Sequence, residues 1–406
     1  MRKTPILLRQ HIGWHFTKHW VVQGKRKPLD TGAEEILKQK GIPVYKPEEL
    51  FREKREFQKV EVVGYMDKPV ALDNTHPDWH DRTLLSFKDN NVLLEGLSQA
   101  QIITKSVEIK KGLPDSIELR ELTKDDREAA ERLTLNSQLL DAEQKKLPKI
   151  KDPARPAWNF PRTYGITQSR RNKRITSKLL SHIESTSDRR LTKERHIFEN
   201  LPFSFSFERS GNLVQLRLSG DFVLASSTPL KPVTSESTDD VTLPDIDPID
   251  PLITLMPENI YRTENVYPIK PTVKKSHPHT LFTFFDREEV RNLYEEEVTD
   301  QQIFGRSLMK TFTAAASYAR QRYGNDVGTL PSPVTLQCVQ TDGQFFHLGV
   351  LQLNTLDLEK GATKNVWYQT PMQYLYDSCS YQVGRPVLAG FNGDIIKQLY
   401  GFYNNV

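Results

Sequence analysis

The sequence predicts an α+β fold, in which a mixed or antiparallel sheet packs against helices in the C-terminal half of the chain. Two stretches carry this prediction, because each alternates apolar and polar residues on both sides of a turn: 203-FSFSFERSGNLVQLRLSG-220 and 334-VTLQCVQTDGQFFHLGVLQLNT-355. The Asp-Gly pair at 342–343 is a strong hairpin signal. Between the two stretches, residues 300–322 repeat apolar side chains at helical spacing, so we expect helices and strands to share one domain.

Composition restricts the class of protein. Of the 406 residues, 37% are hydrophobic, which is enough for at least one core. The 25 prolines and the 27% of charged residues favour a scaffold with long surface segments over a compact enzyme. The formal net charge is only +4, so any contact with nucleic acid must come from local segregation of charge. Two cysteines without a C-x-x-C pattern favour a reducing compartment, and the lack of a long apolar run predicts no membrane insertion.

Residues 1–32 are predicted to be a mitochondrial presequence or a basic arm that is never removed. Residues 1–29 hold seven Lys and Arg, interleaved with apolar residues, and no acid precedes Asp30. That charge pattern is typical of a presequence, whereas the low serine content and Pro5 keep the basic arm as the alternative.

Residues 33–147 are predicted to form a helical and irregular N-terminal region. The stretch at 69–91 is rich in Asp, Asn, His and Pro, which is typical of an irregular loop. Apolar residues at helical spacing, with turn residues at the ends, predict helices elsewhere in the region. The predicted helices lie at 33–42, 92–104 and 120–146.

Residues 148–196 are predicted to form an extended basic arm that binds RNA. The arm begins with prolines among aromatic residues, which excludes a helix interior or a central strand there. Between residues 162 and 195 it holds ten Lys and Arg against three acids. Positive charge beside rings that can stack on unpaired bases is typical of RNA binders, although a solvated charged face is the alternative. The candidate RNA-binding residues are Arg162, Arg170, Arg171, Lys173, Arg174, Lys178, Arg189 and Arg190.

Residues 197–406 are predicted to form the C-terminal α+β domain, with an acidic, proline-rich surface loop at 228–258. A buried strand is predicted at 277–285, since the stretch is apolar and aromatic. Capping boxes at Asp286/Glu289 and Thr299/Gln302 predict the starts of two helices, of which the second spans 300–322. Further helices are predicted at 372–379 and 392–403.

We find no catalytic or metal-binding motif in the sequence. Phosphate-binding and dinucleotide-binding glycine loops, H-E-x-x-H and paired-cysteine motifs are all missing. The stretch 305-GRSLM-309 resembles a nucleophile elbow but has Met309 in place of the second glycine. His277 and His279 share one strand face without a third ligand. We therefore expect no enzyme activity, no catalytic residues, no metal and no cofactor.

A nuclease-like protein acting on RNA is the alternative from another class. Metal-dependent nucleases of the restriction type place an acid on one hairpin strand and an acid-x-Lys pair on the next. Here the second strand carries Gln352 and Asn354, and neutral amides cannot hold the metal. The hairpin is therefore predicted to be scaffold, or a catalytically dead nuclease-like site. A free protein-interaction adaptor is the third possibility.

Four segments of the C-terminal half resemble the animal mitochondrial large-subunit ribosomal protein family numbered thirty-seven. They are 277-HPHTLF-282, 322-RYGND-326, 339-VQTDGQFFHLGVLQLNTLDL-358 and 364-KNVWY-368. The resemblance extends over residues 175–406 and is loose before them. It implies a structural, non-catalytic component of the mitochondrial ribosome in the matrix, which supports mitochondrial translation. It also implies contacts with the large-subunit rRNA and with neighbouring mitoribosomal proteins, including a paralogous one related to programmed-cell-death protein nine.

Overall fold

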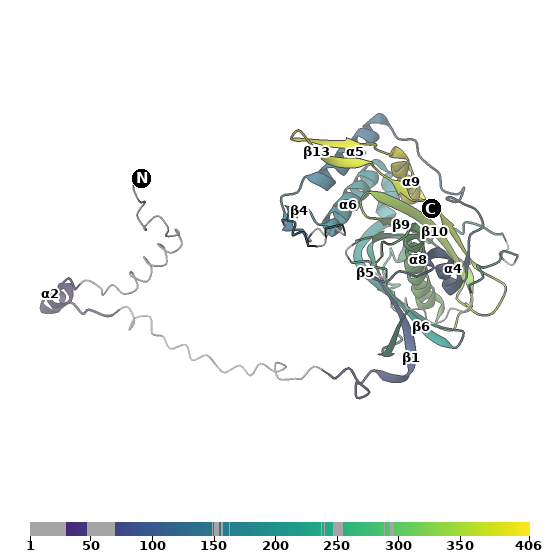
Figure 1. The fold of residues 1–406 in the computed structure, drawn as a ribbon, viewed down its shortest axis with the longest axis horizontal. Helices are drawn as coiled ribbons and strands as arrows, with labels where there is room; N and C mark the ends of the chain where they lie inside the picture. The colour runs from purple at the N-terminus through teal and green to yellow at the C-terminus, as the bar shows by residue number, and fades with distance from the viewer. Residues whose placement is uncertain are drawn as a thin grey trace. The chain divides into compact units, whose positions relative to one another are not determined.

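A computed structural model describes residues 30–46 and 70–406, except residues 148, 150–153, 156, 162, 237, 239, 247–254, 288 and 293–295. The chain divides into two units, residues 1–69 and residues 70–406. In the first unit, helix α2 (Ala33–Gln39) ends before Gly41, whose left-handed backbone (φ 73°) stops the helix as predicted. The predicted presequence lies almost entirely outside the described residues. All other described helices and strands belong to the second unit (Figure 1).

Among the described residues, ten strands form one sheet in the second unit. They are β1 (Trp79–Lys88), β2 (Ser106–Val107), β5 (Arg195–Arg209), β6 (Asn212–Ser226), β7 (Met256–Ile260), β8 (His277–Phe284), β9 (Thr329–Thr341), β10 (Phe345–Thr355), β11 (Asn365–Gln369) and β12 (Gln373–Tyr374). The order is β2-β11-β10-β9-β8-β6-β1-β7, with β5 paired to β6 and β12 paired to β10. The pairs β1/β6, β8/β9 and β2/β11 are parallel and the others antiparallel, so the sheet is mixed. The predicted α+β fold is confirmed.

Both predicted hairpins are confirmed. The turn between β5 and β6 places Ser210 and Gly211 at positive φ (49° and 76°), which matches the twist of the two strands. In the turn between β9 and β10, the Asp342 carboxylate accepts hydrogen bonds from the backbone amides of Gln344 and Phe345. The β9/β10 hairpin lies inside the sheet, because β9 also pairs with β8 and β10 with β11, whereas β5 pairs only with β6 among the described strands.

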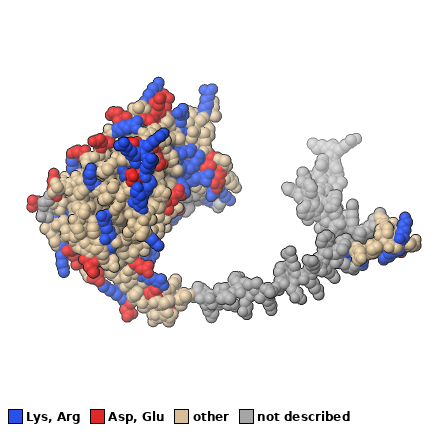
Figure 2. Space-filling model, turned by 180° about the vertical axis from the view of Figure 1, so that it is seen from behind, with Lys and Arg blue, Asp and Glu red and all other residues tan. Residues whose placement is uncertain are grey.

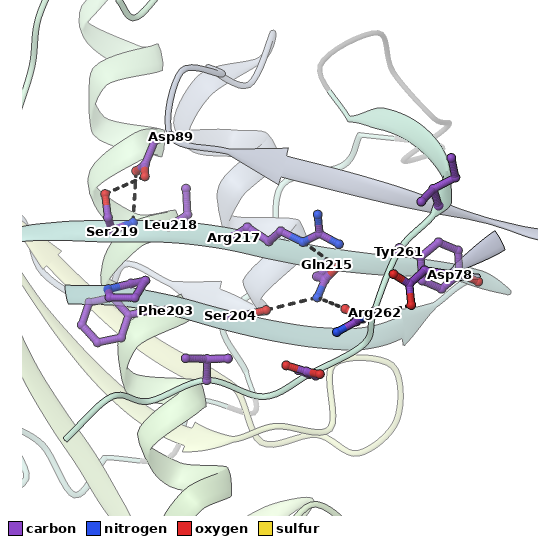
Figure 3. A pocket seen from close by; sticks show the side chains of 14 residues that line it. Asp78, Asp89, Phe203, Ser204, Gln215, Arg217, Leu218, Ser219, Tyr261 and Arg262 are labelled. Carbon is purple, nitrogen blue, oxygen red and sulfur yellow. Dashed lines mark hydrogen bonds and ion pairs between the residues drawn. The ribbon is translucent and has the colours of Figure 1, made fainter. Parts of the chain in front are cut away.

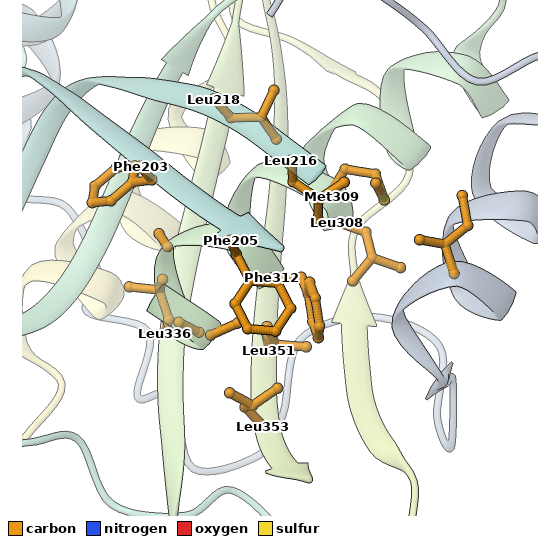
Figure 4. Packing of buried hydrophobic residues seen from close by; sticks show 14 of the residues in the cluster. Phe203, Phe205, Leu216, Leu218, Leu308, Met309, Phe312, Leu336, Leu351 and Leu353 are labelled. Carbon is orange, nitrogen blue, oxygen red and sulfur yellow. The ribbon is translucent and has the colours of Figure 1, made fainter. Parts of the chain in front are cut away.

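Helices cover both faces of this sheet. The described helices of the second unit are α4 (Gly96–Thr104), α5 (Lys124–Leu139), α6 (Gln168–Thr186), α7 (Arg189–Glu194), α8 (Asp300–Tyr323) and α9 (Gly393–Asn404). One apolar cluster joins α4 and α8 to one face, and Figure 4 shows Phe205 and Phe312 within it. A second cluster joins α5, α6 and α9 to the other face. Consecutive β10 residues mark the two faces, because Leu351 lies in the first cluster and Val350 in the second. No helix among the described residues is long and apolar enough to cross a membrane.

Helix α8 is buried over most of its length. Its start is the predicted capping box, in which the Thr299 side chain and the Gln302 side chain bond to each other's backbone amides. Residues from Gln302 to Ala319 are all buried. The stretch that resembles a nucleophile elbow lies inside this helix, and its glycine has a packing reason. A Cβ atom on Gly305 would lie 2.6 Å from the carbonyl oxygen of Gly96 in α4.

Three predictions of secondary structure are wrong. The stretch 69–91 contains β1, because the short apolar run around Leu84 and Leu85 pairs with the distant strand β6. The stretch 372–379 is not a helix, since it supplies β12 and the start of β13 (Ser378–Gln382), which pairs with β14 (Arg385–Ala389). At Asp286 the backbone makes a turn, in which the amides of Glu289 and Val290 both bond to its carbonyl, and the described residues between Asp286 and Thr299 form no helix.

The compact units also differ from the predicted domains. Strand β1 and helices α4, α5 and α6 pack with the sheet, so the predicted boundaries at residues 147 and 196 fall inside one unit. The predicted extended arm of residues 148–196 contains α6, α7 and the short strand β4 (Tyr164–Gly165), which pairs with β3 (Lys145–Lys146). The end of the acidic loop 228–258 enters β7.

Replacing Gly305 with Ala is expected to destabilise the protein, although Gly→Ala in a helix interior normally stabilises by about 0.5–1 kcal/mol. The new methyl group would overlap backbone atoms of α4, and overpacking of this kind costs about 1–3 kcal/mol. Urea denaturation measures the effect. Gly328→Ala is the control, because the nearest atom to its Cβ is 3.7 Å away. A stabilised Gly305→Ala variant would contradict the close contact.

Candidate nucleic-acid interface

Helix α6 carries most of the predicted RNA-binding residues and lies flat on the sheet. Its buried side chains recur at helical spacing, and they contact the second apolar cluster. They are Asn172, Ile175, Thr176, Leu179, Leu180 and Ile183. The helical spacing of these residues can be read from the sequence. We predicted an extended arm instead because many charged residues stand between the apolar ones. The position of every cation on α6 therefore follows from the packing of the helix.

Arg170 and Arg174 bind one carboxylate within the protein. The Arg170 guanidinium forms a two-point ion pair with Asp141, in which its Nη2 lies 3.1 Å from Oδ1. Arg174 Nη1 lies 2.8 Å from Asp141 Oδ2, and its Nη2 donates to the carbonyl of Leu140 at the end of α5. The hydrogen bond from Arg170, followed by that from the backbone amide of Glu143 and by the charge of Arg174, holds the pKa of Asp141 well below its usual value. The two arginines thus fasten α6 to the segment that follows α5.

The other cations of α6 also lie against the protein. Lys173 donates to Glu199 of β5 over 2.6 Å. Lys178 is half-buried, and burial, followed by the neighbouring charge of Arg174, lowers the pKa of its ammonium group. Arg171 is half-buried, and its positive charge opposes the rise that burial causes in the pKa of Cys379. None of these three side chains extends freely into solvent as a flexible arm would.

Arg189 and Arg190 differ from the cations of α6. Both lie on the short helix α7 and are exposed. Within the described part of the chain, no ion pair joins either residue to an acid. Arg162, the remaining candidate, lies outside the described residues. On the face of the molecule that Figure 2 draws, Lys and Arg side chains stand beside Asp and Glu over much of the surface. Arg189 and Arg190 are therefore better candidates for RNA binding than the cations of α6, because they are exposed and have no ion-pair partner among the described residues.

A buried charge network lies between α8 and the sheet, and sequence reasoning did not find it. Lys310 Nζ lies 2.6 Å from Asp89 Oδ1 and donates to the carbonyl of Ser219, and its side chain is 3% exposed. Burial is the largest single influence and raises the pKa of Asp89, but the charge and hydrogen bond of Lys310, the hydrogen bond from Ser219 and the charge of Arg306 together outweigh it, so the pKa lies below its ordinary value. Arg306 donates to Gln340 and to the carbonyl of Asp89. Asp221 is close enough to act electrostatically on both Lys310 and Arg306, so two acidic side chains face the two cations.

A hollow of about 610 Å³ opens on the polar face of β5 and β6, beside this network (Figure 3). Asp89 stands at its edge, bonded to the amide and hydroxyl of Ser219. The other polar groups of the hollow also bond to each other. Arg262 pairs with Asp78 over 2.8 Å, and Gln215 donates to Ser204 and to the carbonyl of Arg262. The hollow therefore presents groups that are already paired, which does not favour a small-molecule site.

The polar residues of the β9/β10 hairpin have structural roles. The Gln352 side chain accepts hydrogen bonds from the amides of Val233 and Thr234, and it donates to the carbonyl of Thr234. It thereby fastens the start of the acidic loop to the sheet. Among the described residues, no group of three His, Cys, Asp or Glu side chains could hold a metal ion. The geometry that a metal-dependent nuclease needs is not assembled by these residues.

Neutralising Asp141 is expected to loosen α6. In Asp141→Asn, both arginines lose a charged partner, so the urea midpoint should fall at pH 7. Because the pKa of Asp141 is lowered by folding, its contribution is present above the unfolded-state pKa of about 3.9 and declines as pH falls below it. The difference between variant and wild type should therefore shrink in acid. Equal midpoints at pH 7 would contradict a structural role for the pair.

Replacing Lys310 with Met is expected to destabilise the protein by about 3–5 kcal/mol, because it leaves the Asp89 carboxylate without its partner. The double variant Asp89→Asn with Lys310→Met removes both charges and should recover most of the loss. Urea unfolding measures both variants. Lys124→Met, at an exposed position, is the control and should change stability by less than about 0.5 kcal/mol. A double variant as unstable as the single one would refute the charge-pairing account.

Comparison with known proteins gives one family and several relatives. The family model described as "Mitochondrial 28S ribosomal protein S30 (PDCD9)" matches residues 270–406. Several relatives carry the name "Large ribosomal subunit protein mL37". The Gallus gallus protein is 32% identical over 223 residues, which are 52% of this chain and 51% of the relative. The Rattus norvegicus protein is 31% identical over 183 residues, 44% of this chain and 42% of the relative.

The Bos taurus protein is 28% identical over 309 residues, 74% of this chain and 68% of the relative. The chain thus spans about half of the chicken relative and about two thirds of the bovine one. The family model carries a small-subunit name, whereas the relatives carry a large-subunit name. Together these matches confirm the resemblance found in the sequence: the chain is similar to the mitoribosomal large-subunit proteins called mL37.

Proposed function

We propose that this chain is a structural component of the mitochondrial large ribosomal subunit, located in the matrix, where it supports mitochondrial translation. The observation that carries the proposal is the similarity to proteins named for that subunit, which reaches 74% of this chain in the bovine relative. The small-subunit name of the family model describes residues 270–406 only. We favour the large subunit because the relatives match a longer part of the chain.

The structure supports a role without catalysis. The polar groups in the interior, such as Lys310 and Gln352, bond to other parts of the protein rather than converge on an open site. The hollow on the sheet is lined by paired groups, as described above. A protein that is built into a large assembly needs a stable body and exposed side chains that can meet its neighbours, and the buried clusters and the exposed cations of α7 are consistent with this need.

Contact with rRNA and with neighbouring mitoribosomal proteins, including a paralogous one, forms part of the proposal. Of the candidate RNA-binding residues, Arg189 and Arg190 are the best placed, because they are exposed on α7. Arg170, Lys173 and Arg174 would reach a phosphate only by giving up ion pairs within the protein or by sharing them, and Arg171 and Lys178 are half-buried. Charge-assisted pairs of this kind hold a helix in place, which is the role we assign to them.

Sedimentation of a mitochondrial matrix extract tests the proposed function. We expect the protein to migrate with markers of the large subunit and to leave that position after digestion with RNase. Migration with the small subunit would support the name of the family model instead. Migration as a free species in untreated extract would contradict a ribosomal role and favour the adaptor alternative.

A further inference from the structure

Segments far apart in the sequence meet at one end of the central sheet. Arg195, the first residue of β5, pairs with Ser226, the last residue of β6. Ser226 also pairs with His277, the first residue of β8. Helix α7 immediately precedes β5, and the turn 270–275 precedes β8. The fold thus brings α7 and this turn to the same end of the sheet.

Direct contacts confirm that α7 and the turn are neighbours. Lys275 Nζ donates to the carbonyl of Arg195 over 2.7 Å. Lys274 Nζ lies 4.0 Å from a carboxylate oxygen of Glu194. The amide of Ser227 bonds to the carbonyl of Glu194, which adds the chain that leaves β6. Three segments that are separated by about 30 to 80 residues therefore form one continuous surface.

This surface is strongly basic. The segments 189–195 and 270–275 together contain seven Lys and Arg residues and one acid, Glu194. Asp188, which precedes them, accepts a hydrogen bond from the backbone amide of Arg190 and caps α7. We call the exposed cations of the two segments the basic sheet end. They are Arg189, Arg190, Lys193, Lys270 and Lys274.

Glu194, the single acid within this surface, is surrounded by positively charged side chains. The Glu194 carboxylate accepts a hydrogen bond from the Ser227 hydroxyl, and this bond is the main reason that the pKa of Glu194 lies below its ordinary value. Lys274, Lys275 and Arg195 lower the pKa of Glu194 further. One carboxylate is thus shared among several cations, unlike Asp141, whose carboxylate is bound at both oxygens by two arginines.

Neighbouring elements extend the basic character. Arg322, near the end of α8, is exposed, and its Nη1 lies 3.2 Å from His277 Nδ1. Burial, followed by the charge of Arg322, lowers the pKa of His277, so the imidazole is neutral at neutral pH and accepts from Arg322. Lys231 is exposed a few residues after the end of β6. The positive charge therefore extends from α7 towards the end of α8.

We infer that the basic sheet end is a docking surface for the phosphate backbone of ribosomal RNA. The inference rests on the proposed function and names the part of the chain that touches the RNA. Exposed lysines and arginines without stacked aromatic rings favour contact with phosphates over contact with bases. The cores of protein–protein interfaces are apolar and depleted in lysine, and the large exposed apolar residue here is Val273 alone among the described residues of the two segments.

Measured affinity for RNA tests the inference. The basic-end variant replaces Arg189, Arg190, Lys193, Lys270 and Lys274 with Gln, and the matched control replaces five exposed cations elsewhere. The control positions are Lys111, Lys124, Arg132, Lys360 and Arg385. Each variant changes the formal net charge from +4 to −1, since five positive charges are removed. All ten positions are exposed, so both proteins should keep the melting temperature of the wild type.

Binding of the full chain to transcribed mitochondrial large-subunit rRNA is measured by filter retention between 50 and about 200 mM KCl. We expect the basic-end variant to bind at least about tenfold more weakly than wild type, with a slope of log K against log salt reduced by about 3.5 to 4.5 for five phosphates. The control should stay within about twofold. Equal losses in the two variants would overturn the inference, because net charge alone would then explain binding. Unchanged binding of the basic-end variant would overturn it as well.

Sedimentation of the same proteins from mitochondria separates this inference from the proposed function. If wild type, control and basic-end variant all migrate with the large subunit in equal amounts, the docking surface is refuted and the ribosomal role stands. If wild type itself migrates free, the proposed function fails. A variant that binds bare rRNA normally but leaves the subunit would show that this surface contacts an acidic protein neighbour, which also overturns the inference. Selective loss of the basic-end variant in both assays is the supporting result.

Discussion

The burial of α8 between α4 and the sheet is the constraint on which the rest of the second unit depends. A helix buried over residues 302–319 has no face for its polar side chains, so each of them requires a partner inside the protein. Arg306 finds Gln340, Lys310 finds Asp89, and Ser307 bonds to His347 over 2.8 Å. The polar residues of the sheet and of the turn after β1 are therefore matched to this one helix.

The same constraint explains why chemically reactive residue types in the interior are inert. His347 is completely buried against the ring of Phe304, and burial lowers its pKa to about 3, so it stays neutral at any physiological pH. Cys338 is also completely buried, and burial raises the pKa of its thiol to about 11. His347 is neutral, Cys338 is protonated, and both lie beside Ser307 of the buried helix α8. They are packing groups here, because no substrate can reach them. Function is left to the surface.

Local signals predicted the elements that local chemistry determines. The Asp342 turn, the Thr299 capping box and the alternation in the hairpins each lie within a few residues, and each was found. Strand β1 was missed because its apolar run is short and its parallel partner β6 lies more than a hundred residues away. The β13/β14 hairpin was missed for another reason. Its two-residue turn places Val383 at positive φ (49°) before Gly384, and β-branched residues rarely adopt that conformation, so the Asn-Gly or Asp-Gly pair that signals a hairpin is missing there.

The candidate site shows the limit of counting charges along a chain. By sequence, the cations of α6 and α7 belong to one basic segment, and nothing local distinguishes Arg174 from Arg190. In the fold, Asp141 meets α6 from the end of α5, and Glu199 meets it from β5, so that helix is largely neutralised. Helix α7 instead meets a turn with three more lysines. A phosphate group is attracted to charge that the protein has not already matched. Long-range contacts decide which positive charges remain unmatched. The position of a surface that could bind nucleic acid therefore depends on the topology of the sheet.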